Sequence, residues 1–172
     1  MRWQAFWQIL FIALVLAACD QSTDDEAVAS EGAIATPPLA LSAEDRAYLT
    51  AMRSTVERAQ QALIQFATQE ALAKDNPSLL SDMRWRQDTA ATLLLLEQTG
   101  QDLQHHSPVP PDLAVLNEEC IALGKDLVAL ATDYAKGIDE SSLSRAAAAV
   151  DDQRSANARL QKIAGLFENL GQ

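Results

Sequence analysis

The sequence is poor in the residues from which catalytic sites and disulfide scaffolds are built. Its 172 residues include two histidines, two cysteines, six glycines and 5% aromatic residues. Two cysteines cannot form a disulfide framework. Alanine and leucine make up much of the apolar fraction, and both lose little side-chain freedom in a helix. With so few glycines to interrupt them, they predict an all-α fold.

Positive charge is also scarce. The chain carries 13 Lys and Arg against 24 Asp and Glu, which gives a formal net charge of −11. A nucleic-acid-binding surface needs clustered Lys and Arg to displace the counterions of the phosphate backbone. The composition therefore argues against nucleic acid as a partner, and against charge-driven adhesion to anionic lipid.

The first residues are typical of an export signal. Arg2 is the only cation before residue 46, and residues 5–18 are apolar except for Gln8. A helix of about fourteen residues spans about 21 Å, which is short of the roughly 30 Å hydrocarbon core of a bilayer. We therefore predict that residues 1–18 are a cleaved signal peptide, not a membrane span.

This signal ends in Leu16-Ala17-Ala18-Cys19, which resembles the lipobox of bacterial lipoproteins. The resemblance implies cleavage between Ala18 and Cys19, a diacylglycerol thioether on Cys19 and, usually, acylation of the new amino terminus. Each buried methylene contributes about 0.8 kcal/mol, so two or three acyl chains would anchor the protein to the bilayer. The alternative is an ordinary signal whose small residues happen to precede a cysteine.

Asp20 follows the cysteine directly. In the lipoproteins of many two-membrane bacteria, Asp at this position resembles a retention signal for the inner membrane, and this implies a location on its periplasmic side. The alternative is that Asp20 only begins an acidic tract. Residues 20–40 contain five acids and no base, so we predict a lipidated cysteine and a disordered acidic tether over residues 19–40.

Residues 41–172 are predicted to form one domain, an up-down-up-down antiparallel four-helix bundle. Its helices are expected at about 42–73, 77–105, 110–136 and 140–170. Ser42 with Asp45 predicts the first helix start, Asn76 with Pro77 the second, and Gly137 the end of the third. Near-equal helix lengths and short connections favour antiparallel neighbours.

The third expected helix has the most regular pattern. Its apolar residues alternate three and four apart, the repeat that packs one helix along another. They are Leu113, Leu116, Cys120, Leu123, Leu127, Leu130 and Tyr134. We expect Cys120 to be a core residue, because free cysteine behaves as a small hydrophobe. A reactive thiol and an intermolecular disulfide are the alternatives.

The second expected helix has two apolar stripes on roughly opposite sides. One bundle helix needs a single broad apolar face, so one stripe is available to a partner or to a second copy of the chain. The alternative is one broad face that includes both edges. The first stripe holds Leu79, Met83, Ala90 and Leu94, and the second holds Trp85, Thr89, Thr92, Leu96 and Leu103.

Candidate partner-binding residues lie on this helix. Trp85 is flanked by Arg84 and Arg86, and Trp and Arg carry much of the binding energy at protein interfaces. We name these three residues and Leu96 as the candidate contact site. The alternatives are that Trp85 is buried in the bundle and that the two arginines neutralise acids on neighbouring helices.

Both histidines, His105 and His106, lie at the expected end of the second helix. Asp102 and His105 have the spacing of a metal-binding pair, but a diiron bundle needs Glu-x-x-His on two helices and further glutamates. Adjacent acids such as Glu118 and Glu119 point about 100° apart on a helix, unlike a catalytic dyad. We therefore expect no enzyme, no cofactor and no metal site, with Asp102 and His105 as weak candidates.

Together these features predict a membrane-anchored bacterial lipoprotein with a non-enzymatic bundle that acts through protein contacts in the cell envelope. The expected partners are the bilayer, through the acyl chains on Cys19, and an envelope protein or a second copy. The alternative is a sensor or carrier that binds a small ligand or a metal. Its support is the small and polar residues of the last helix, which include Gln153 and Asn157.

Overall fold

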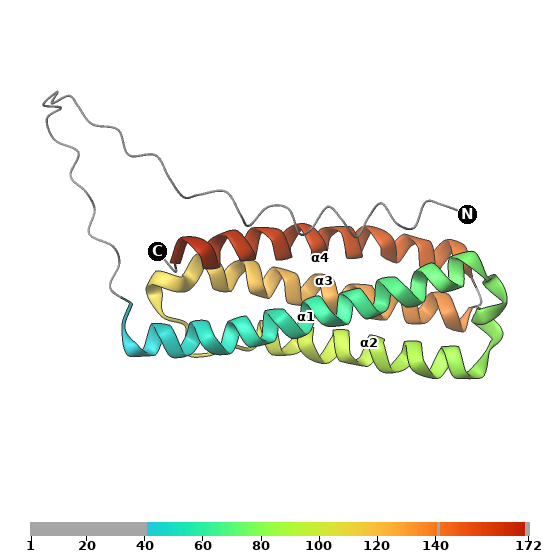
Figure 1. Ribbon diagram of the computed structural model, residues 1–172, viewed down its shortest axis with the longest axis horizontal. Coiled ribbons are helices and arrows are strands. Elements are labelled where there is room, and N and C mark those ends of the chain that lie inside the picture. Colours follow the sequence, from blue (N-terminus) through green and yellow to red (C-terminus); the bar gives the residue numbers. More distant parts are fainter. Residues whose placement is uncertain (1–40, 141, 171–172) are drawn as a thin grey trace, which may run out of the picture. The chain divides into compact units, whose positions relative to one another are not determined.

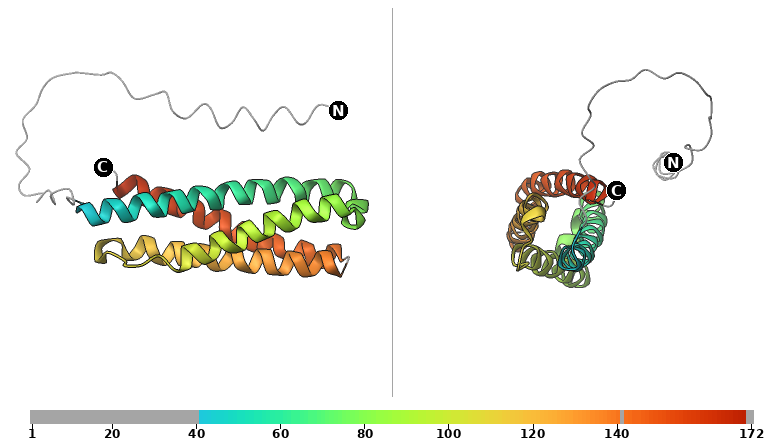
Figure 2. Two further views of the ribbon diagram at one scale, coloured as in Figure 1. Left: turned by 90° about the horizontal axis from the view of Figure 1, so that it is seen from below. Right: turned by 90° about the vertical axis from the view of Figure 1, so that its left-hand side faces the viewer.

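The computed structural model describes residues 41–140 and 142–170, without the side chains of Leu143, Arg145, Ala147 and Ala148. All regular structure in these residues is helical, as predicted. Four long helices pack against one another, and they lie side by side along the longest axis in Figure 1. They are α1 (Ala43–Asp75), α2 (Met83–Gln104), α3 (Ala114–Asp139) and α4 (Leu143–Leu170). Viewed end-on, they form a four-cornered arrangement (Figure 2).

Helix α1 begins where the local sequence predicts it. The backbone N–H of Asp45 donates to Ser42 Oγ at 3.0 Å, and the backbone N–H of Ser42 donates to Asp45 Oδ2 at 2.7 Å. This reciprocal capping box satisfies two N–H groups that the first turn of a helix leaves free. The helix ends at Asp75, two residues beyond the expected boundary.

The predicted start of the second helix at Pro77 is wrong. Pro77–Ser81 form a separate 3-10 helix, η1, and α2 starts at Met83. Asp82 is the true N-cap, because its Oδ1 accepts a hydrogen bond from the backbone N–H of Trp85 at 2.7 Å. Helix α2 is therefore only 22 residues long, and the helices are not of near-equal length.

Both predicted boundaries of the third helix also shift. Pro111–Leu113 form a short 3-10 helix, η2, and α3 runs from Ala114 to Asp139. Gly137 is therefore inside the helix and not beyond its end. A Cβ on Gly137 would lie 2.6 Å from the backbone N of Ala146, so this glycine lets α4 approach α3 closely.

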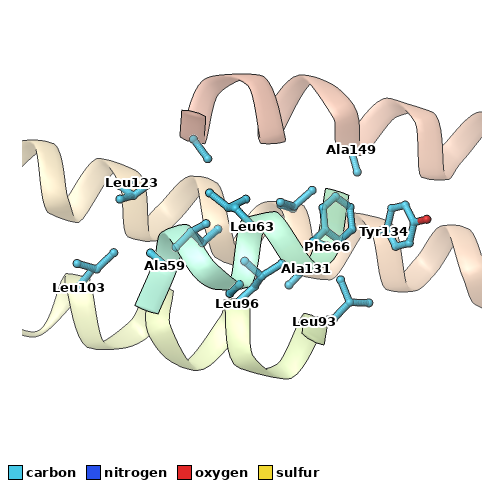
Figure 3. Close-up of a cluster of buried hydrophobic side chains, with 14 of the residues drawn as sticks. Ala59, Leu63, Phe66, Leu93, Leu96, Leu103, Leu123, Ala131, Tyr134 and Ala149 are labelled. Atoms are coloured by element: carbon cyan, nitrogen blue, oxygen red, sulfur yellow. The ribbon is translucent and has the colours of Figure 1, made fainter. Parts of the chain in front are cut away.

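The core lies between the four helices, as the regular apolar pattern of α3 predicts. All seven residues of that pattern are buried, with at most 2% of each exposed. Figure 3 shows side chains from each helix meeting in this core. Phe66 of α1 packs edge-to-face on Tyr134 of α3, with ring centroids 4.7 Å apart and an interplanar angle of 83°.

Helix α4 presents small residues to the core, but not both of the expected polar ones. Ala146, Ala149 and Ala156 are buried, whereas Gln153 is half-buried and Asn157 is exposed. Asn157 is therefore not available to a ligand in the core, because its neighbour Ala156 occupies the side of α4 that faces the other helices. Small side chains allow the close approach of α4 to α3 seen at Gly137.

Candidate functional site

The predicted lipidation site lies outside the described residues. This applies to Ala18 and Cys19 at the cleavage site, to Asp20, and to the tether that extends to residue 40.

Two of the four candidate contact residues lie in the core. Trp85 is 7% exposed and Leu96 is fully buried, which disagrees with the prediction that they contact a partner. The structure agrees instead with the alternative interpretation, in which Trp85 is buried in the bundle. The sequence predicted two apolar stripes on opposite sides of α2. The stripe that contains Trp85 is the one that faces the other helices.

The arginines beside Trp85 have different surroundings. Arg86 ties three elements together: its guanidinium donates to the carbonyl oxygens of Leu80 and Ile138 and to Asp139 Oδ1, at 3.3, 3.5 and 3.1 Å. It therefore neutralises an acid of α3, which was the alternative interpretation. Arg84 is exposed.

The apolar side chains that α2 does expose belong to the other stripe. Met83 is 75% exposed and Leu94 is 53% exposed, and Ala90 between them is exposed too. Leu79 of the same predicted stripe lies in η1 and is half-buried. Helix α2 therefore does present an apolar surface to solvent, on the side opposite Trp85.

The weak metal candidates are engaged with protein groups. Asp102 forms an ion pair with Arg58 of α1 at 3.1 Å. His105 Nδ1 lies 2.7 Å from the carbonyl oxygen of Gln101; since a carbonyl only accepts, Nδ1 is the donor. Within residues 41–140 and 142–170, no group of three or more His, Cys, Asp and Glu side chains is placed to hold a metal ion.

His106 joins the α2–α3 connection to α1, a contact that the sequence did not predict. Its Nε2 lies 3.4 Å from the hydroxyl of Thr55, and its ring packs edge-on against Tyr48. The Thr55 hydroxyl donates to the carbonyl oxygen of Ala51 and so has no second proton to give. It therefore accepts from His106 Nε2 and from Arg58, whose Nη2 lies 3.3 Å away.

A buried polar group lies next to this contact. The hydroxyl of Tyr48 donates to Asn117 Oδ1 at 2.8 Å, linking α1 to α3. Burial, with a smaller contribution from the charge of Cys120, raises the pKa of Tyr48 to about 12. Burial also raises the pKa of the Cys120 thiol to about 12, so this thiol is protonated near neutral pH. A protonated, buried thiol is a poor nucleophile.

The main charged cluster joins α3 and α4. Arg159 donates to Asp126 at 2.7 Å and to Glu119 at 3.4 Å, and Lys162 donates to Glu119 at 2.6 Å. Ser155 completes the cluster with a hydrogen bond to Asp126 at 2.7 Å. The hydrogen bond from Lys162 is the main reason that the pKa of Glu119 is below its usual value. Glu119 therefore helps to hold α4 against α3.

Four buried polar atoms have no hydrogen-bond partner within the described residues. They belong to the core side of α2 and to the facing part of α1, and they are Gln69 Oε1, Trp85 Nε1, Thr89 Oγ1 and Thr99 Oγ1. A buried polar group without a partner costs roughly 1–3 kcal/mol. Three of these four atoms belong to α2, so its core side carries buried polar groups that the other helices do not satisfy.

No family model, curated protein or solved structure matches this chain. Within the described part of the chain, no helix combines the length and the apolar character that a bilayer span requires.

Proposed function

We propose that the protein is a membrane-anchored bacterial lipoprotein whose helical domain acts through protein contacts on the outer side of the cytoplasmic membrane. The observation that carries the anchor is the lipobox-like sequence ending in Ala18-Cys19, which follows an apolar signal of the right length. In a two-membrane bacterium that sorts lipoproteins by the residue after the cysteine, Asp20 keeps the protein on the periplasmic side of the inner membrane.

The proposal includes an up-down-up-down antiparallel arrangement of the four helices. Contacts between α2 and α3 support it, because Arg86 near the start of α2 meets Asp139 at the end of α3, whereas Gly100 later in α2 meets Gly124 earlier in α3. The same reversed order of contacts holds for the other two pairs of neighbouring helices. Late in α1, Gln69 contacts Asp88 early in α2, whereas Arg58 earlier in α1 contacts Asp102 late in α2. At the end of α3, Gly137 lies against Ala146 early in α4, whereas Glu119 early in α3 contacts Lys162 late in α4.

Contact function, as opposed to catalysis, is supported by the state of the groups that most often perform chemistry. The thiol of Cys120 is buried with a raised pKa, and each histidine has a ring nitrogen committed to a neighbouring group. The exposed apolar side chains Met83 and Leu94 are of the kind that protein interfaces use.

Cell fractionation tests the anchor. In cells that make the full chain, we expect the protein in the membrane fraction and incorporation of labelled fatty acid. Cys19→Ala should abolish the label and release or mislocalise the protein. Cys120→Ala is the matched control, because it removes the other cysteine and should keep both label and location. An unlabelled wild-type chain in the soluble fraction would contradict the proposal.

A second candidate function is the binding of a small polar ligand in the core beside α2. It is favoured by the unpartnered buried atoms Trp85 Nε1, Thr89 Oγ1 and Gln69 Oε1, which offer donors and acceptors. Native mass spectrometry of the purified full chain tests it. A retained small molecule that is lost in Thr89→Val would support this candidate, and a bare chain mass would reject it.

A further inference from the structure

The first half of α1 is attached to every other part of the bundle by side chains that carry polar groups. Four side chains within residues 43–58 reach α3, α4, the connection between α2 and α3, and α2. We call residues 43–58 the α1 strap. The four contacts are Tyr48–Asn117 at 2.8 Å, Arg53–Phe167 at 5.1 Å to the ring centroid, Thr55–His106 at 3.4 Å and Arg58–Asp102 at 3.1 Å.

The two halves of α1 differ in how much apolar surface they bury. Residues 59–75 bury five apolar side chains, among them Leu63 and Phe66. The α1 strap buries only two, Tyr48 and Met52. Apolar burial is the main source of folding stability, and an ion pair as exposed as that of Arg58 contributes little. The α1 strap is therefore held less firmly than the second half of the helix.

Helix α1 as a whole also packs least closely on its neighbours. Helices α2 and α3 touch through Gly100 and Gly124, and α3 touches α4 through Gly137. Helix α1 contains no glycine, and it packs less extensively on α2 than these pairs do, and least on α4. Figure 2 shows α1 and α4 as neighbouring corners, yet among the described residues no hydrogen bond or ion pair joins them.

We propose that the α1 strap is a conformational device, which releases from α3 and α4 while the rest of the bundle stays folded and then closes again through its four contacts. Local opening begins where few apolar side chains are buried and where the contacts lie near solvent. Both conditions hold for residues 43–58, and neither holds for α3, whose regularly spaced apolar residues are buried.

Release of the α1 strap uncovers Cys120. This side chain is fully buried, and it contributes to the raised pKa of Tyr48, so the two side chains lie close together. Asn117, which accepts the hydrogen bond from Tyr48, is three residues before Cys120 and therefore on the same side of α3. Cys120 is thus a natural reporter of the opening.

The position of the α1 strap gives the opening a consequence for the anchored protein. Helix α1 is the first helix of the described domain, so the proposed anchor on Cys19 is connected to the bundle through residues 43–58. A pull on the anchor would act on the strap before it acts on the other helices. This consequence rests on the proposed function, whereas release of the strap does not.

Thiol labelling of Cys120 tests the release. In the full chain with Cys19→Ser, Cys120 is the only thiol, and a maleimide reacts with it only when it is uncovered. We expect labelling in the absence of urea. The logarithm of its rate should rise with urea at no more than about a third of the slope of global unfolding, because local opening exposes little surface.

Two variants locate the opening. Tyr48→Phe removes the hydrogen bond to Asn117 and should raise the labelling rate about fivefold. Ile138→Val is the matched control, since it removes one buried methyl group at the other end of α3. It should lower the urea midpoint but change the labelling rate by less than about twofold. If labelling required global unfolding, Ile138→Val would raise its rate by the factor by which it lowers the folding equilibrium constant.

Arg58→Met provides a second variant of the α1 strap that leaves the buried hydrogen bond of Tyr48 in place. It removes an exposed ion pair, and it should raise the labelling rate about threefold. Hydrogen exchange measured by mass spectrometry should show faster exchange in residues 43–58 of both strap variants, with α4 unchanged. Circular dichroism reports whether each variant keeps the helical fold.

Four results would overturn the proposal. The first is labelling with the urea dependence of global unfolding, and the second is equal acceleration by Ile138→Val and Tyr48→Phe. The third is labelling at the rate of a free thiol, which would mean that Cys120 is accessible without any opening. The fourth is faster exchange in α4 of the strap variants. Failure of the anchor in cell fractionation is a separate result, because these measurements use the Cys19→Ser chain.

Discussion

Gly100 of α2 and Gly124 of α3 lie in direct backbone contact. A Cβ added to Gly100 would lie 2.6 Å from the carbonyl oxygen of Gly124, and a Cβ on Gly124 would collide with the carbonyl oxygen of Gly100 in the same way. Both residues are buried within helices. The obstacle is backbone and not a flexible side chain, so α2 and α3 can cross this closely only because both positions are glycine.

Gly124→Ala should therefore destabilise the domain. Alanine improves helix propensity by about 1 kcal/mol, but overpacking a close contact costs about 1–3 kcal/mol. Because the obstacle is backbone, the cost should lie toward the upper end of that range, and we expect a net loss of up to about 2 kcal/mol, measured as a lower midpoint in urea unfolding followed by circular dichroism. Gly165→Ala is the control, because no atom lies within 4 Å of its Cβ position. It should raise the midpoint, and a fall as large as that of Gly124→Ala would refute the steric argument.

The features that the sequence predicted correctly are local or strictly periodic. The capping box joins Ser42 to Asp45 three residues away, so a single turn determines it. The second feature is the α3 seam, by which we mean the seven regularly spaced apolar residues from Leu113 to Tyr134. A helix face that carries so many large apolar groups has to be buried. Neither prediction required knowledge of another helix.

The orientation of α2 was not predictable from its apolar pattern. Both stripes are apolar, and the choice between them depends on the helices that α2 meets. Gly100 indicates which stripe of α2 faces the other helices. It lies four residues after Leu96 and three before Leu103, and therefore on the same side of the helix as both. A glycine on one stripe of a helix interior indicates close helix packing there, and Gly124 shows the same on α3.

The start of α2 and the α3–α4 ion pairs were missed for a different reason. Asn76 and Asp82 both suit an N-cap, and only the folded chain shows that a 3-10 turn separates them. Glu119 and Lys162 are 43 residues apart, so their pairing depends on how α3 and α4 are aligned. Residue types alone do not define that alignment.

Leu127→Asp should unfold the domain. Leu127 is fully buried on the α3 seam, and a carboxylate placed there loses its hydration without gaining a partner. We expect loss of the cooperative unfolding transition in circular dichroism. Val115→Asp, at a 61% exposed position near the start of the same helix, should stay folded. A Leu127→Asp variant with a normal midpoint would show that the core has been assigned incorrectly.

Arg159→Met should destabilise the domain more than Arg154→Met. Arg159 is 34% exposed and bonds to two partly buried carboxylates, whereas Arg154 and Asp151 are 76% and 81% exposed. Hydrogen bonds between charged groups contribute about 1.5–3 kcal/mol each when sheltered, and exposed pairs contribute about 0–1 kcal/mol. Arg159 is still one-third exposed, so solvent screens its bonds below that value, and we expect a loss of about 1–2 kcal/mol for Arg159→Met and at most about 0.5 kcal/mol for Arg154→Met. Equal losses in urea unfolding would mean that the cluster is screened by solvent.

The stability of the domain should fall as the pH rises above 9. Burial raises the pKa of the Cys120 thiol to about 12, whereas its ordinary value is 9.0. The neutral form is therefore favoured in the folded state. Between pH 9 and 12 the unfolded chain loses this proton and the folded chain keeps it, so ionisation stabilises the unfolded state. Tyr48, with a pKa raised from 10.0 to about 12, adds to the effect above pH 10.

Urea midpoints measured from pH 7 to 11 test this dependence, and two variants separate the contributions. Cys120→Ala should lower the midpoint at pH 7, because it leaves a cavity in the core, but should flatten the decline that begins at pH 9. Tyr48→Phe should leave the decline between pH 9 and 10 in place and make it less steep above pH 10, where Cys120 and Tyr134, whose pKa burial also raises to about 12, still contribute. A midpoint that is constant up to pH 11 in the unaltered chain would mean that the thiol ionises in the folded protein. In that case Cys120 would have to be accessible to water, in conflict with its place on the α3 seam, because a thiolate is stable only where it is solvated or paired.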